Sequence, residues 1–306
     1  MANQIQTDDF AEIRTQLYIG AYQAVINNLS STNNQYKRIN QDETKLLLSR
    51  AYLALGRYNL ALSELDNSGG KATLEAAKIF VKYHQAKAAK NNAEMDKLAD
   101  EASALLETES NITDPSFVVI LSLIYLNQER YEDSMKLLAL HPQNIECIAI
   151  MTQAYLMINR VDMAEQLLAR SKKQFEESPI YQLAEAWVCL FVGGKKNDRA
   201  FYTFDELGQL ISSPSVKLMN CQAISKLHLN QYPEAEGILL EAMDKESSNA
   251  DTLVNMNICS ILMEKDAETL NRLKSQLEDQ HPNIAFVADI NKKAALFDEL
   301  ANKFAA

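Results

Sequence analysis

The sequence predicts an all-helical protein built as a stack of paired helices, that is, an α-solenoid. Helix breakers are scarce, because eight Gly and six Pro in 306 residues are well under half of average usage, which is roughly 12% for the two together. An aromatic, small and bulky pattern recurs along the chain, and turn signals fall at a matching spacing. With 47% hydrophobic residues, the chain can also bury a large core.

The recurring pattern is an aromatic residue, a small residue nine positions later and a bulky apolar residue four positions after that. Copies are Tyr52, Ala61 and Leu65; Tyr125, Ser134 and Leu138; Tyr155, Ala164 and Leu168; and, lengthened by four residues, Trp187, Ala200 and Phe204. A small side chain lets two helices approach each other, and the aromatic ring fills the space beside it. The pattern and its period of about 34 residues are those of the tetratricopeptide repeat.

The remaining repeats are weaker but keep the period. Val25 and Leu29 form an early copy, and Ala235 and Thr269 continue the series toward the C-terminus. Because Ala61 and Ser134 are 73 residues apart, a degenerate unit must lie around Leu98 and Ala99. Residues 1–9 are expected to be a flexible N-terminal tail.

Turn signals divide the units. Asp114-Pro115, Ser178-Pro179 and Ser213-Pro214 each place a capping side chain before a proline, as at a helix start. Short connections within hairpins are expected at Leu55–Tyr58, Asn127–Tyr131 and Asn159–Val161.

The C-terminal segment 283–306 is predicted to be a helix that caps the stack. Its apolar residues Phe286, Ile290, Phe297, Leu300 and Phe304 have helical spacing. About nine helix pairs then account for residues 1–306 as a single domain, wound as a right-handed superhelix with a concave groove.

Composition excludes several classes of function. A net charge of −11 argues against nucleic-acid binding, which needs clustered Lys and Arg. The N-terminus has no secretory signal pattern, and no apolar run is long enough to span a bilayer. We therefore expect a cytoplasmic protein without direct membrane insertion.

No catalytic, cofactor or metal site is predicted. The four cysteines, Cys147, Cys189, Cys221 and Cys259, are far apart in sequence, which favours buried reduced thiols over a metal or redox site. Gly193-Gly194-Lys195-Lys196 lacks the first glycine of a phosphate loop, and a lengthened helix-helix turn explains it better. Trp187 could be an interface residue, although its place in the aromatic slot favours core packing. The sequence thus predicts a protein that is not an enzyme.

The groove is the better candidate for function. One residue after the aromatic slot stand Leu53, Leu126, Leu156, Val188, Leu227 and Ile261. Neighbouring inner positions include Arg50, Gln153 and Glu185. Either the apolar side chains pack only between adjacent hairpins, or they form an apolar strip that binds an extended or hairpin segment of a partner.

Five segments carry a further signal: residues 17–23, 50–54, 186–194, 235–242 and 251–255. Together they resemble the epsilon subunit family of coatomer, the coat of vesicles that move within the Golgi and back to the endoplasmic reticulum. The 186–194 segment, from Ala186-Trp187 to Gly193-Gly194, is the most specific, because a generic repeat would not carry that insertion.

The resemblance implies a non-catalytic subunit of the COPI coat. It implies a hetero-oligomer in which the superhelix curls around an extended hairpin from the C-terminal region of the alpha subunit, peripheral to Golgi and vesicle membranes. An alternative is a tetratricopeptide adaptor or co-chaperone that binds peptide segments of another partner. That alternative requires Lys, Arg and Asn clustered along the inner helices, and no such cluster stands out in the sequence.

Overall fold

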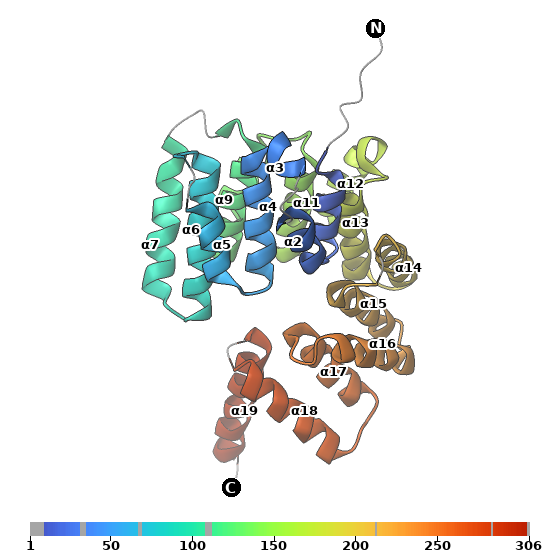
Figure 1. Ribbon diagram of the computed structural model, residues 1–306. Helices are drawn as coiled ribbons and strands as arrows, with labels where there is room; N and C mark the ends of the chain where they lie inside the picture. Colours follow the sequence, from blue (N-terminus) through green and yellow to red (C-terminus); the bar gives the residue numbers. More distant parts are fainter. Residues whose placement is uncertain are drawn as a thin grey trace. The chain divides into compact units, whose positions relative to one another are not determined.

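The computed structural model describes residues 9–30, 35–66, 69–107, 112–211, 213–282 and 284–304. All but the last residue of the predicted N-terminal tail, 1–9, lies outside these ranges. Within them every regular element is a helix. The chain divides into two compact units, Met1–Val192 and Gly193–Ala306, which are described separately (Figure 1).

The first unit is a series of helical hairpins. Each second helix packs on its own first helix and then on the first helix of the next hairpin. The helices are α1 (Ala11–Tyr18), α2 (Tyr22–Ser30), α3 (Gln35–Ile39), α4 (Gln41–Ala54), α5 (Tyr58–Leu65), α6 (Ala72–Ala88), α7 (Asn92–Ala104), the 3₁₀ turn η1 (Leu105–Glu107), α9 (Pro115–Asn127), α10 (Tyr131–Leu138), α11 (Ile145–Met157), α12 (Val161–Phe175) and α13 (Pro179–Val192).

The second unit repeats the same arrangement and ends in one longer helix. Its helices are α14 (Lys196–Gly208), α15 (Val216–His228), α16 (Tyr232–Lys245), α17 (Ala250–Leu262), α18 (Ala267–Gln280) and α19 (Ala285–Phe304). Consecutive helices from α14 to α18 pack against one another.

One turn geometry recurs inside the hairpins. In each of these turns, a residue two or three positions before the second helix has a positive φ. These residues are Gly56, Lys90, Glu129, Asn159, Asn230 and Glu264. The next backbone N–H then donates to the carbonyl five residues earlier, as Arg130 does to Tyr125 (2.9 Å) and Arg160 to Tyr155 (2.8 Å). This Schellman-type closure satisfies carbonyls at the helix end and reverses the chain. Glycine or asparagine occupies several of these positions because both tolerate the left-handed conformation.

Polar side chains fix the starts of the first helices. Asp114 accepts a hydrogen bond from the Ser116 backbone N–H (2.9 Å), and Pro115 then begins α9 as predicted. The expectation for α15 was wrong by two residues. Its cap is Ser215 rather than Ser213, because the Ser215 side chain reaches the backbone N–H of Leu218 (3.2 Å).

The small residue of each repeat is buried. Ala61, Ser134, Ala164, Ala200 and Ala235 are all 0% exposed, and the bulky residues that follow them are buried as well. The degenerate unit is also confirmed, since Leu98 and Ala99 are buried on α7. The predicted all-helical hairpin stack is therefore confirmed.

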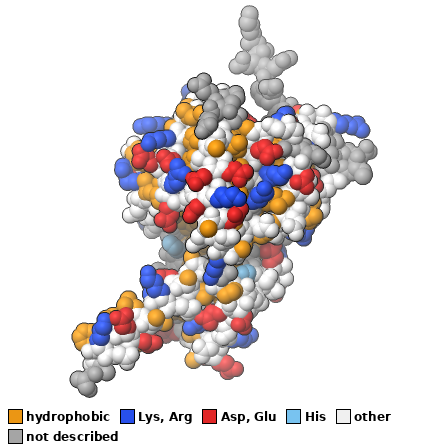
Figure 2. Space-filling view, turned by 90° about the vertical axis from the view of Figure 1, so that its left-hand side faces the viewer, with side chains coloured by type: hydrophobic (Ala, Val, Ile, Leu, Met, Phe, Trp, Pro, Cys, Tyr) orange, Lys and Arg blue, Asp and Glu red, His pale blue; other side chains and the backbone are white. Residues whose placement is uncertain are grey.

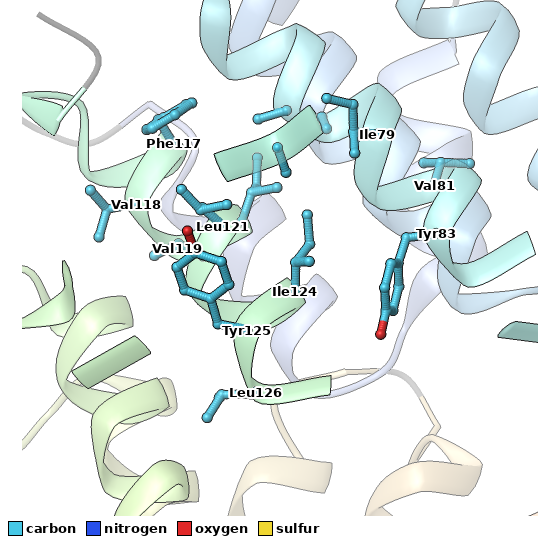
Figure 3. Close-up of a cluster of buried hydrophobic side chains, with 14 of the residues drawn as sticks. Ile79, Val81, Tyr83, Phe117, Val118, Val119, Leu121, Ile124, Tyr125 and Leu126 are labelled. Atoms are coloured by element: carbon cyan, nitrogen blue, oxygen red, sulfur yellow. The ribbon is translucent and has the colours of Figure 1, made fainter. Parts of the chain in front are cut away.

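The core of the first unit is densest around α9. Phe117, Leu121 and Ile124 are fully buried there (Figure 3). Residues on nearly every side of this helix are buried, which is expected of a helix covered by neighbours all round. The turn at its C-terminus is closed by Arg130, whose guanidinium stacks over the Tyr125 ring at 4.2 Å.

The terminal helix covers the stack only in part. Val287 is its buried residue, and it packs with Leu253 and Leu277 of α17 and α18. From Asn291 to Phe304 every residue of α19 is exposed. The predicted capping contact therefore involves the first turns of this helix.

Leu121→Ala should destabilise the first unit by about 2–5 kcal/mol, because it leaves a cavity in a core that cannot fully collapse. Leu140→Ala is the matched control, because Leu140 is 53% exposed and a surface change costs less than about 0.5 kcal/mol. Urea unfolding followed by the fluorescence of Trp187, the single tryptophan, measures both. Equal midpoints for the two variants would contradict the assigned core.

Candidate partner-binding surface

The first helices of the hairpins form a closed ring in the first unit. In the chain order α4, α6, α9, α11 and α13, each contacts the next, and α1 contacts both α4 and α13. The ring can be followed in Figure 1 from α4 through α6, α9 and α11 to α13. The inner wall, where a solenoid would bind an extended segment, is therefore turned toward other first helices of the same unit.

An ion pair crosses the ring. The guanidinium of Arg50 on α4 donates a hydrogen bond to the carboxylate of Glu146 on α11. Their side chains are only 22% and 16% exposed. Burial by itself lowers the pKa of a guanidinium, but the attraction and hydrogen bond of Glu146 outweigh it and raise the pKa of Arg50. Arg50 is thus a permanent cation held by one carboxylate.

Tyr18, at the end of α1, completes this polar centre. Burial raises the pKa of its hydroxyl, and the negative charge of Glu146 raises it further, so the tyrosine stays neutral. Nearby, Arg14 of α1 donates to Glu43 of α4 at 2.9 Å. These contacts bind the first helix to the middle of the unit.

A small cavity lies between three of the ring helices. A cavity of about 10 Å³ is lined by Arg50, Leu53, Phe80, Ile120 and neighbouring residues of α4, α6 and α9. That volume is at the lower limit for one water molecule. A larger polar pocket of about 280 Å³ opens at the N-terminal ends of these three helices, between Asp42, Glu43, Lys71 and Asp114.

The predicted groove residues of the first unit lie in different surroundings. Arg50 and Leu53 line the small cavity between α4, α6 and α9. Leu126, Leu156 and Val188 are 4%, 6% and 4% exposed. Leu156 and Val188 lie in one apolar cluster, and Leu126 lies in another.

Two further groove positions of the first unit are polar. Gln153 is exposed on α11, and Glu185 is half-buried on α13. Trp187, beside Glu185, is half-buried and packs against the cluster that holds Leu156 and Val188, as its aromatic slot predicts.

The second unit presents a different surface. Leu227 of α15 is 9% exposed and belongs to the cluster beneath α16 and α17. Ile261 of α17 is 58% exposed, and the adjacent Leu262 is 44% exposed. Among the groove positions predicted from sequence, Ile261 is the one with a large hydrophobic side chain open to solvent.

The described residues contain no cluster of three or more His, Cys, Asp or Glu side chains suited to a metal ion. His141 and His281 contact the backbone carbonyls of Ile112 (2.8 Å) and Ser248 (2.6 Å) and so tie turns together. In the same described part of the chain, no helix combines the length and apolar character needed to cross a bilayer.

Sequence reasoning missed two residues of the polar centre, Glu146 and Tyr18. Glu146 follows the cap Asn144, where an acidic residue is ordinarily explained by the helix dipole. The available signal was Arg50, a charged residue at an inner position, which required a partner of opposite charge.

Comparison with known proteins gives one consistent family. The family model described as coatomer epsilon subunit matches residues 6–305. The chain is 29% identical to coatomer subunit epsilon-1 of Arabidopsis thaliana over the full length of both chains. It is 27% identical to coatomer subunit epsilon of Dictyostelium discoideum, covering 97% of this chain and 99% of that one.

Solved structures resemble the chain in fold, at low sequence identity. The chain resembles one from the APC/C hetero-tetramer Cut9-Hcn1 with a TM-score of 0.62 at 12% identity, covering 94% of this chain and 57% of that one. It also resembles a tetratricopeptide repeat protein from Parabacteroides merdae with a TM-score of 0.58 at 12% identity, covering 82% and 97%.

Breaking the central ion pair should be costly. Arg50→Met leaves the Glu146 carboxylate uncompensated, and a loss of about 1–3 kcal/mol is expected. Arg50→Met combined with Glu146→Leu should recover part of that loss, because both charges are then removed. A double-mutant cycle with urea unfolding measures the coupling.

The matched control is Lys136→Met, which breaks the exposed pair between Lys136 and Glu132. It should leave the urea midpoint unchanged, because exposed pairs contribute little. Additive effects at Arg50 and Glu146 would contradict the coupling of these two charges across the ring.

The thiols should be unreactive in the folded chain. All four cysteines are buried, and burial raises the pKa of Cys147 and of Cys221 to about 12. At pH 8 a thiol of that pKa is about one part in 10⁴ thiolate. Labelling with an aromatic disulfide should therefore be slow in buffer and rapid for all four cysteines in urea. Stoichiometric labelling of the folded chain within seconds would contradict it.

Proposed function

The chain belongs to the coatomer epsilon subunit family, and on that premise we propose that it binds and stabilises the C-terminal region of the coatomer alpha subunit. As a component of the vesicle coat it acts without catalysis, by holding a partner chain. Its place of action is the cytosolic face of Golgi and vesicle membranes, in transport within the Golgi and back to the endoplasmic reticulum. The observation that carries the proposal is the family match over residues 6–305.

The second unit supplies the more accessible binding surface. Ile261 and Leu262 of α17 are already exposed, so an apolar side chain of the partner can cover them without moving a helix. Burial of such side chains contributes about 25 cal/mol per Å² of apolar surface. Ile261 is therefore the first contact residue to test.

The first unit supplies a second, slower mode of binding. We expect a segment that reaches Arg50 and Leu53 to part the Arg50–Glu146 ion pair, because the small cavity that Arg50 and Leu53 line holds only about 10 Å³. It must then offer a carboxylate to Arg50 or a cation to Glu146, since an unpaired buried charge is costly. A segment held in this way leaves slowly, because release repeats the opening of the ring.

The test uses the tagged full chain and the C-terminal region of the alpha subunit from the same organism. An equimolar complex is expected in gel filtration. Ile261→Asp should raise the Kd of this complex at least about tenfold, a loss of about 1.4 kcal/mol of binding free energy. Leu140→Asp is the control, because Leu140 is a similarly exposed apolar residue, and it should bind like the unmodified chain.

The outcomes separate the function from the site. Absence of a complex between the unmodified chains would overturn the proposed function. Equal binding by Ile261→Asp and Leu140→Asp would leave the function in place and remove Ile261 from the contact surface.

A further inference from the structure

An apolar seam runs along α19, half-buried at Phe286 and Ile290 and exposed from Phe297 onward. Phe286, Ile290, Lys293, Phe297, Leu300 and Phe304 follow one another at steps of 4, 3, 4, 3 and 4 residues. This is the spacing of the a and d positions of a coiled coil, with Lys293 as the single polar member. Phe297, Leu300 and Phe304 are 71%, 43% and 83% exposed.

Figure 2 shows hydrophobic side chains beside Lys and acidic side chains at the lower left of the view, toward the C-terminal end of the chain. The charges of this helix balance. Lys292, Lys293 and Lys303 stand against Asp289, Asp298 and Glu299. A membrane surface is a poor occupant, because anionic lipids attract helices rich in Lys and Arg. A second helix with the same apolar spacing and balanced charge is a better occupant of the seam.

We propose that the seam of α19 binds the same seam of a second copy of this chain, as an antiparallel two-helix coiled coil. In this alignment Ile290 faces Leu300 of the other copy, and Phe286 faces Phe304. Lys293 faces the ring of Phe297, where a cation is favourable over an aromatic face. The four inner seam positions, from Ile290 to Leu300, pair with one another in full, whereas Phe286 also packs on the cluster of Leu253 and Leu277 and offers Phe304 only its remaining exposed part.

The flanking residues select the antiparallel direction. Asp289 of one copy lies opposite Lys303 of the other, twice by symmetry, and Leu296 lies opposite Leu296 at the two-fold axis. Leu296 is 53% exposed, so this contact also removes apolar surface from water. The present partners of Asp289 and Lys303 are exposed residues one turn away, Lys293 and Glu299, and such pairs are exchanged at little cost.

The parallel alignment is disfavoured by the same residues. It would place Lys293 against Lys293 in the seam, where two like charges repel at short distance. Asp289 would face Ala294, so no complementary charges would meet. The sequence of α19 is thus self-complementary in one direction only, and a two-fold interface of this kind closes after two copies.

The occupant is testable with the purified full chain. Sedimentation from about 1 to about 100 µM should show a monomer-dimer equilibrium, and Phe297→Glu should weaken it at least about tenfold. Ala295→Glu is the control, because Ala295 is exposed on the opposite face of the same helix, and it should dimerise like the unmodified chain. Circular dichroism checks that both variants keep their helix content.

The direction is tested by crosslinking with a short bis-maleimide. Leu296→Cys should link two copies, because these residues meet at the two-fold axis. Asp289→Cys should not, because the two positions are about 21 Å apart along the axis. Efficient linking through both positions would overturn the antiparallel arrangement.

Two results of the sedimentation experiment would overturn the proposal itself. If the chain stays monomeric at about 100 µM, the seam does not bind a second copy, and its partner is a helix of another protein. If Phe297→Glu and Ala295→Glu change the dimer dissociation constant equally, the chain self-associates through another surface.

Discussion

The close crossing of two helices in each hairpin is the constraint on which the rest of this structure depends. Ala61, Ser134, Ala164 and Ala235 have no exposed surface, so a larger side chain at any of them would force the helices apart. The aromatic and bulky positions are placed by that approach, because they fill the space left beside the small residue. Interiors packed at crystal-like density transmit such displacements, and a change at one crossing would therefore shift the next hairpin as well.

Regular crossings also bring the ends of the first unit together. Each hairpin adds its own rotation, and α1 consequently meets α13. The polar centre then joins residues 96 positions apart, Arg50 and Glu146. A ring filled only by apolar residues would close with less desolvation of charge. The ion pair instead places two charged groups at the centre of the first unit, where an apolar core would place none.

Much of the fold could be predicted from sequence, because the repeat is a local signal. The aromatic slot, the small residue and the turn that follows lie within one hairpin, so Tyr125 and Ser134 reveal their roles without knowledge of the rest of the chain. The polar centre could not be predicted in this way. Glu146 pairs with Arg50 only because several hairpins intervene with a particular cumulative rotation, and no local pattern encodes that sum.

The groove positions show a second limit of local reasoning. Leu126 and Ile261 occupy equivalent places after the aromatic slot, yet one is 4% exposed and the other 58%. The difference lies in the neighbours. α9 has a first helix of another hairpin on each side, α6 and α11, within the closed ring. α17 has such a neighbour on one side only, α15, and the first turns of α19 lie beyond its own hairpin. The same residue type in the same register thus packs in one hairpin and faces solvent in another.

The C-terminal helix follows from the same physics. A solenoid must cover its last hairpin, because that hairpin has no successor to bury its apolar side. Val287 and Phe286 supply this cover against Leu253 and Leu277, and a few turns of helix are sufficient for it. The remaining turns of α19 gain nothing from the stack, so their apolar residues need another reason to be there. The regular 3.5-residue spacing of these residues, which covering one hairpin does not require, is the property that a second helix recognises.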